Sequence, residues 1–195
     1  MFPFSSFLPY VFITAYTPGP NNILSMSNAS RLGFRRSFPF NLGILLGFSI
    51  VMLLCAVFSA ALFTFLPKVR PVMLALGAGY MLFLAYKTLR GGSSLQADKK
   101  NSRTSGFLSG FLLQFVNPKI IIYGVTSLST YILPFTTEPL WVCLSAIFLA
   151  LVGFSGTLCW ALFGSMLSRL FSQHARAVNV IMALLLVYCT AALFF

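Results

Sequence analysis

Six long apolar stretches, separated by short gaps that hold almost every charged residue, constrain this 195-residue chain more than any other feature. Only 8% of the residues are charged and 58% are hydrophobic, whereas about 25% of the residues of a soluble domain are charged. This number of charges is too small to cover the surface of a soluble protein. We therefore expect an exterior that faces lipid. The apolar stretches cover residues 4–30, 38–65, 71–89, 106–133, 140–163 and 178–195.

The lengths of these stretches fit transmembrane helices, which need about 20 residues to cross a bilayer. The sequence therefore predicts an all-α integral membrane protein with six transmembrane helices in a single domain, residues 1–195. We read residues 1–20 as part of a retained first span and not as a signal peptide, because they carry no basic leader region.

The basic residues are distributed unevenly among the five gaps. Ten Lys and Arg residues lie in or beside the first, third and fifth gaps, two lie in the second, and the fourth holds only Glu138. Alternate gaps share one side of the membrane, and the side richer in Lys and Arg faces the cytoplasm. We therefore expect both termini on the opposite side. The net charge of +11 is explained by this asymmetry, so we expect no nucleic-acid partner.

One segment reads as a true linker, the polar stretch GGSSLQADKKNSRTS at 91–105. Its Gly, Ser and charged residues are typical of a flexible, solvated connection. It divides the chain into half-repeats 1–90 and 106–195, each with three predicted spans. Three spans is an odd number, so the two halves enter the membrane from opposite sides. The sequence thus predicts a 3+3 inverted repeat, a common construction of secondary transporters.

Both halves interrupt their first span with proline next to asparagine, as TPGPNN at 17–22 and as QFVNPK at 114–119. Proline has no N–H and leaves carbonyl groups of the preceding turn without a donor. In lipid such groups are tolerated only where they face protein or a wet cavity. Structural kinks are the alternative, but matching Pro-broken helices 1 and 4 favour a solute site. The candidate solute-binding residues are Pro18, Gly19, Pro20, Asn21, Asn22, Gln114, Asn117, Pro118, Lys119 and Tyr123.

Lys119 lies near the middle of the fourth predicted span and is the one basic residue not assigned to a gap. A lysine at mid-membrane costs about 2.5–3.5 kcal/mol on insertion scales, and such residues usually face an interior cavity. Snorkelling toward the interface is the alternative, but the central position of Lys119 argues against it. An ammonium beside a helix break predicts binding of the carboxylate of an amino-acid-like solute.

No Asp or Glu lies inside a predicted span, so a buried carboxylate cannot relay protons; Lys119, Tyr123 or water would have to serve. The four cysteines lie singly in apolar stretches without ligand spacing, which predicts no metal, no cofactor and no redox pair. Two GxxxG spacings, Gly43–Gly47 and Gly106–Gly110, allow close helix contact. They fit packing within the bundle and a homodimer equally well.

With these residues in view, the sequence resembles the LysE/RhtB family of bacterial amino-acid exporters. The resemblance rests on TPGPNN at 17–22, LGILLG at 42–47 and NPK at 117–119, and it runs along nearly the whole chain. Longer stretches, such as LQFVNPKI at 113–120 and ALLLVYC at 183–189, are closest to the cysteine/O-acetylserine exporter branch. The resemblance implies a bacterial inner-membrane exporter of small amino acids, with the lipid bilayer and the solute as its partners and an ion gradient as its driving force.

Two other function classes compete with an exporter. An intramembrane enzyme would need a nucleophile with a base, a metal cluster or paired cysteines, and the predicted spans contain none of these arrangements. A non-transporting membrane subunit is the second alternative, although two broken helices and a central lysine would have no purpose in it. We therefore expect a transporter and no catalytic residues.

Overall fold

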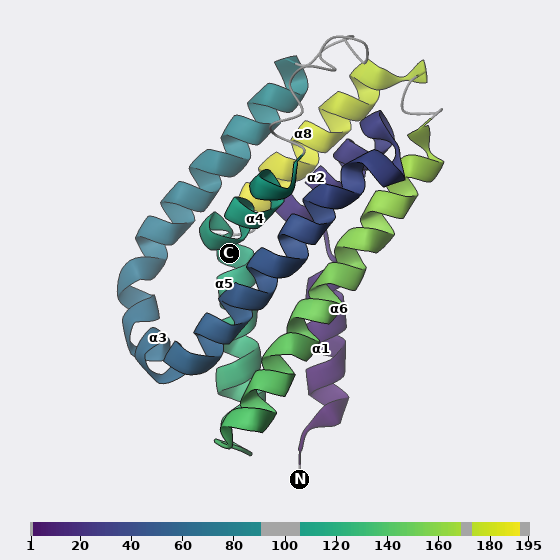
Figure 1. Cartoon of the computed structure of the whole chain (residues 1–195). Helices are drawn as coiled ribbons and strands as arrows, with labels where there is room; N and C mark the ends of the chain where they lie inside the picture. Colours follow the sequence, from purple (N-terminus) through teal and green to yellow (C-terminus); the bar gives the residue numbers. More distant parts are fainter. Residues whose placement is uncertain (1, 91–105, 169–172, 192–195) are drawn as a thin grey trace.

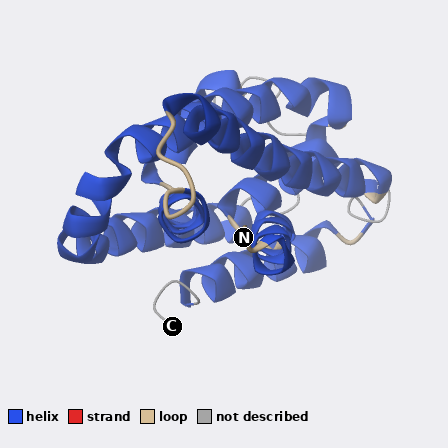
Figure 2. Cartoon of the chain, turned by 90° about the horizontal axis from the view of Figure 1, so that it is seen from below, coloured by secondary structure: helices blue, strands red, loops and turns tan. Residues whose placement is uncertain are grey.

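The computed structural model describes residues 2–90, 106–168 and 173–191, which form helices joined by short connections (Figure 1). Figure 2 shows no strand in this described part, so the predicted all-α class is confirmed. The predicted linker at 91–105 lies outside the described residues. The elements are α1 (Phe4–Tyr16), α2 (Pro20–Leu32), α3 (Phe34–Arg90), α4 (Phe107–Val116), α5 (Pro118–Thr126), the π-helix η2 (Ser127–Ile132), α6 (Pro139–Met166) and α8 (Ala175–Ala191).

The helix α3 covers both the second and the third predicted spans. Its ribbon turns back on itself in the middle, so both of its ends lie at the upper end of the molecule in Figure 1. The sequence predicts a gap at 66–70, whereas helix continues through it.

Two helices, Phe34–Phe58 and Pro139–Met166, are each long and apolar enough to cross a membrane, and Phe107–Val116 with Pro118–Ile132 makes a third if counted as one bent span. The chain is thus a helical protein with two or three clear membrane spans in its described part, and the six-span arrangement stays a prediction.

The described helices bring the basic segments to one end. In Figure 1 the α2–α3 turn, the end of α3 and the start of α8 lie at the upper end, whereas α1 and α6 begin at the lower end. The side chains of Arg31, Arg35 and Arg36 at the turn, and of Arg176 in α8, are exposed. The chain reverses at Gly33, whose φ of 79° is a conformation that other residues rarely adopt.

Glycines allow α3 and α4 to pack backbone against backbone. A Cβ on Gly43 would lie 1.9 Å from the Phe107 carbonyl oxygen, and one on Gly110 would lie 2.1 Å from that of Phe40. On Gly47 it would lie 2.6 Å from the Phe111 carbonyl oxygen. The Gly43–Gly47 pair therefore serves packing within the chain, so a homodimer would have to use another face.

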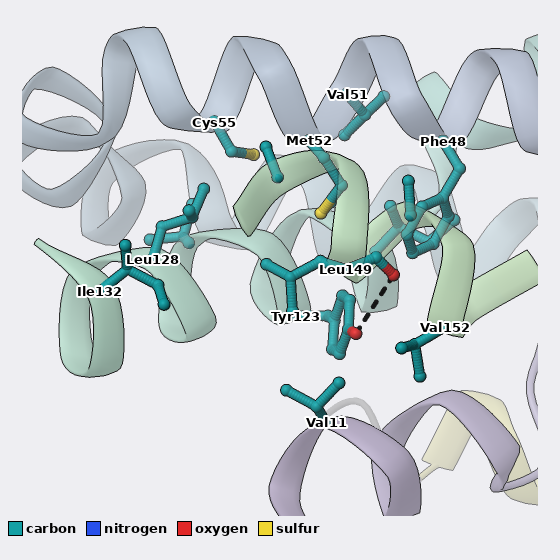
Figure 3. Close-up of a cluster of buried hydrophobic side chains, with 14 of the residues drawn as sticks. Val11, Phe48, Val51, Met52, Cys55, Tyr123, Leu128, Ile132, Leu149 and Val152 are labelled. Carbon is teal, nitrogen blue, oxygen red and sulfur yellow. Dashed lines mark hydrogen bonds between the residues drawn. The ribbon is translucent and has the colours of Figure 1, made fainter. Parts of the chain in front are cut away.

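The lower half of the molecule is held together by an apolar cluster (Figure 3). Side chains from α1, α3, α5, η2 and α6 meet there, among them Val11, Met52, Tyr123, Leu128 and Leu149. Each of these five is at most 3% exposed. The outward faces carry large apolar side chains too, such as Val57 at 72% and Leu140 at 66% exposure. Apolar groups both inside and outside are what a bilayer solvent requires.

Candidate functional site

The first proline motif separates α1 from α2. The α1 helix ends at Tyr16, and the backbone is extended at Thr17 and at Gly19 before α2 begins at Pro20. A residue that precedes proline is disfavoured in the helical region, and both Thr17 and Gly19 precede one. Asn22 reaches back across this break, because its Nδ2 donates to the carbonyl oxygens of Ala15 at 2.9 Å and Thr17 at 2.8 Å.

The second motif separates α4 from α5 at a single residue. Asn117 is extended, with φ −90° and ψ 101°, and α5 begins at Pro118. The Asn117 side-chain oxygen accepts a hydrogen bond from the Lys119 backbone N–H at 3.2 Å and so caps the new helix. The two helical segments on either side are bent by 62°. A proline at the first position of a helix has no N–H to leave unpaired, so both α2 and α5 begin favourably.

Lys119 joins the two breaks, although they are about a hundred residues apart in sequence. Its Nζ donates to the Thr17 carbonyl oxygen at 3.0 Å, the Thr17 hydroxyl at 3.1 Å and the Pro18 carbonyl oxygen at 3.2 Å. These are charge-assisted bonds to carbonyls that the break leaves without a helical donor. Gly19 makes room for them, because a Cβ there would lie 3.0 Å from the Cδ and Nζ of Lys119.

Three amide side chains form a buried hub beside this lysine. Asn21 Nδ2 donates to Gln114 Oε1 at 2.8 Å, and its Oδ1 accepts from Gln114 Nε2 at 3.2 Å and from Asn117 Nδ2 at 3.3 Å. Gln114 Nε2 also donates to the Gly110 carbonyl oxygen at 2.6 Å. All three residues are at most 8% exposed. The sequence predicts these amides as solute ligands, whereas the structure pairs them with one another, so their first role is to hold the two breaks together.

Two cavities meet at the breaks. The smaller, about 30 Å³, has room for about one water molecule. The larger, about 300 Å³, reaches the lower end of the size range of small-molecule sites. Gly19, Pro20, Asn117 and Lys119 line both cavities, so the two cavities adjoin at these residues. The smaller is also lined by Thr14, Phe48, Tyr123, Gly153 and Thr157, and the larger by Thr17, Pro18, Met81, Tyr188 and Cys189.

The ends of the broken helices give the site two electrostatic poles. The N-termini of α2 and α5 begin at its edge, and the partial positive charge there favours an anion. The carbonyl groups at the end of α1, with those of Thr17 and Pro18, favour a cation. No Asp or Glu is among the described residues that line either cavity. Helix breaks of this kind can therefore receive a carboxylate and an ammonium side by side.

The remaining predicted residue, Tyr123, lines the smaller cavity, and its hydroxyl donates to the Leu149 carbonyl oxygen at 3.4 Å (Figure 3). Thr17 and Cys189 were missed by the sequence reasoning. For Thr17 a signal existed, because it precedes Pro18 inside the motif. For Cys189 none existed, because only the folding of α8 against α3 brings it to the larger cavity.

A helical membrane protein with two proline-containing helix interruptions, a half-buried lysine that joins them and a cavity beside it has the form of a transporter. The sequence matches the LysE type translocators over residues 12–195, so the chain belongs to this family. The family identifies a multi-pass membrane transporter of small amino-acid solutes, not an enzyme.

Proteins named cysteine/O-acetylserine efflux protein are 46% identical to the chain over 191 residues. They come from Escherichia coli O1:K1, Escherichia coli strain K12 and Shigella flexneri serotype 5b, and the match covers 98% of this chain and 97% of each relative. No solved structure matches the sequence.

Proposed function

We propose that this protein exports small amino acids and related metabolites, cysteine and O-acetylserine in particular, across a bacterial inner membrane. The names of relatives that match nearly the full length support this choice of solute. The observation that carries the proposal is the Lys119 ammonium bound to the Thr17 and Pro18 carbonyl oxygens, beside two adjoining cavities at the meeting point of two helix breaks.

The solute binds through its two charged groups in this proposal. Its carboxylate pairs with Lys119 and is favoured by the N-termini of α2 and α5. Its ammonium takes the place of the Lys119 ammonium at the carbonyl oxygens of Thr17 and Pro18. The lysine then turns from these carbonyls to the carboxylate, so neither charge is left without a partner at any stage. A solute that lacks either group leaves one pole unpaired, which is costly in a buried site.

Transport follows from rocking of two halves about this site. Half-repeats 1–90 and 106–195, joined by the linker 91–105, would form a 3+3 inverted repeat of six spans with Pro-broken helices 1 and 4. Both termini would then be periplasmic, in agreement with the basic residues at the opposite end. The two cavities that adjoin at Lys119 support alternating access, and an ion gradient would drive it. Residues 1–195 would form a single transporter domain.

Flux into proteoliposomes tests the proposal. We expect the wild-type protein to move labelled O-acetylserine and cysteine, faster when a pH gradient is imposed, and not to move N-acetylcysteine, which lacks the ammonium. Lys119→Met should abolish the flux, whereas Lys119→Arg, which keeps the charge, should retain part of it. Arg176→Met serves as the matched control because Arg176 is an exposed cation away from both cavities. Normal flux through Lys119→Met would show that the ammonium has no part in solute binding.

A further inference from the structure

The seam between α2 and α3 contains buried polar groups that the site described above does not use. On α2 these are Ser25 and Asn28, which follow Asn21 at helical spacings of four and seven. On α3 they are Ser37 and Asn41. Ser25, Ser37 and Asn41 are 0% exposed. Spacings of three, four and seven place residues on one face of a helix, so each helix presents a polar stripe.

Helices α2 and α3 are in contact with each other and are joined by the turn at Gly33. Leu24 on α2 packs against the buried cluster of Phe40 and Ile44 on α3 and Leu113 on α4. Ser25 and Asn41 each lie eight residues from the turn at Gly33, or about 12 Å along the helix at 1.5 Å per residue. The two side chains therefore lie at the same level of the seam.

Three polar atoms in this seam have no hydrogen-bond partner within the described part of the chain. They are the Ser25 hydroxyl oxygen, the Asn28 side-chain nitrogen and the Asn41 side-chain oxygen. Buried polar groups in native proteins are nearly always paired, and an unpaired group calls for an explanation. All three lie on α2 and α3, the two helices joined at Gly33, whereas the other such atom in the described residues, the Ser127 hydroxyl oxygen, lies in η2.

The seam runs from the smaller cavity to the α2–α3 turn. At its inner end Asn21 and Phe48 line the smaller cavity. At its outer end is the α2–α3 turn with the exposed Arg31 and Arg35. Between these two ends Leu24 packs on the cluster of Phe40, Ile44 and Leu113.

We propose that the α2–α3 seam is the passage through which a small hydrated solute, with donor and acceptor groups such as a zwitterion carries, moves between the basic end and the smaller cavity. This inference rests on the proposed export function. When Leu24 separates from this cluster, water or the solute pairs with the hydroxyl and amide atoms. Their unpaired state in the closed seam raises the energy of that state and lowers the cost of opening.

Thiol labelling tests the passage without using transport as its readout. Ser25→Cys and Asn41→Cys are made in the full-length protein in liposomes and treated with a small water-soluble thiol reagent, and each labelled peptide is quantified by mass spectrometry. The native Cys55, 2% exposed in the apolar cluster, is the internal control. We expect labelling of both introduced cysteines about tenfold faster than that of Cys55, because local opening admits water to the seam. Excess O-acetylserine should slow it severalfold. Should either variant fail to reach the membrane, Ser37→Cys reports on the same seam.

Labelling no faster than that of Cys55, in protein that transports normally, would overturn the passage. Fast labelling in a protein that moves no amino acid would refute the proposed export function, although the seam would still be hydrated. Failure of the passage and failure of the export function therefore give different results.

A second variant separates a passage from a packing defect. Ser25→Ala removes an unpaired group and should raise the thermal stability in either case, but only a passage also predicts a severalfold lower export rate. Ser49→Ala is its control, because the half-buried Ser49 hydroxyl bonds within its own helix to the Leu45 carbonyl oxygen. An unchanged export rate in Ser25→Ala would contradict the passage.

Discussion

Replacement of Gln114 by leucine tests whether the amide hub holds the two helix breaks together. The substitution keeps the approximate volume and removes a side chain that makes three hydrogen bonds, two with Asn21 and one with the Gly110 carbonyl oxygen. Because Gln114 is 0% exposed, water does not replace it, and the Asn21 amide N–H loses its partner.

The size of the effect follows from that unpaired group. Leaving one buried donor without a partner costs about 1–3 kcal/mol, whereas interhelical hydrogen bonds in membrane proteins average about 0.6 kcal/mol, with a maximum near 1.7. We therefore expect Gln114→Leu to lower the free energy of unfolding by about 1–2 kcal/mol, a roughly five- to thirtyfold change in the folding equilibrium. The double variant with Asn21→Leu should cost less than the sum of the two single variants, because it removes both partners.

Reversible unfolding in mixed detergent micelles, followed by tryptophan fluorescence, measures this free energy. Thr190→Val is the matched control: Thr190 is 6% exposed, but its hydroxyl bonds only to Leu186 of its own helix, so its loss should cost little. Additive losses in the double variant, or a Gln114→Leu protein as stable as wild type, would refute the hub.

Three further substitutions distinguish residues that act on solute flux from residues that act on the stability of the fold. Gly19→Ala should lower O-acetylserine flux in proteoliposomes with little change in thermal stability, since the new methyl group meets only the flexible end of Lys119; an unchanged flux would argue against the lysine position. Gly43→Ala should destabilise the protein by about 3 kcal/mol or more in the same unfolding assay, because its Cβ meets the Phe107 backbone, which cannot move aside; a stable variant would contradict the close contact of α3 and α4. Replacement of all four cysteines by alanine should leave export intact, because no step of the proposed transport uses a thiol, and loss of flux with normal protein levels would favour thiol chemistry.

The fold class and the positions of both breaks were predictable because each depends on local chemistry. Sparse charge dictates a lipid-facing exterior whatever the tertiary structure, and proline removes a helical hydrogen bond wherever it occurs. The helix boundaries at Tyr16 and Pro20, and at Val116 and Pro118, follow from this chemistry. The π-helix at 127–132 carries no comparable signal in the sequence.

The contacts inside the site were less predictable because they join residues far apart in the chain. Lys119 was singled out from its depth alone, but that Thr17 and Pro18 accept its hydrogen bonds depends on how the two halves pack. Asn21 and Gln114 were predicted to face a solute, and only the structure shows that they bond to each other. Ser25 and Asn41 were not singled out because single polar residues in an apolar stretch carry no signal until the structure shows that they are buried.

In the proposed mechanism the two helix breaks enclose a water-filled compartment within the membrane. A spin label on Thr17→Cys, in protein whose native cysteines are replaced by alanine, measures this directly when its collisions with a water-soluble nickel complex are compared with those with lipid-soluble oxygen. We expect collisions with the nickel complex to dominate and added O-acetylserine to reduce them. Dominant collisions with oxygen would place the break against acyl chains and rule out a water-filled compartment.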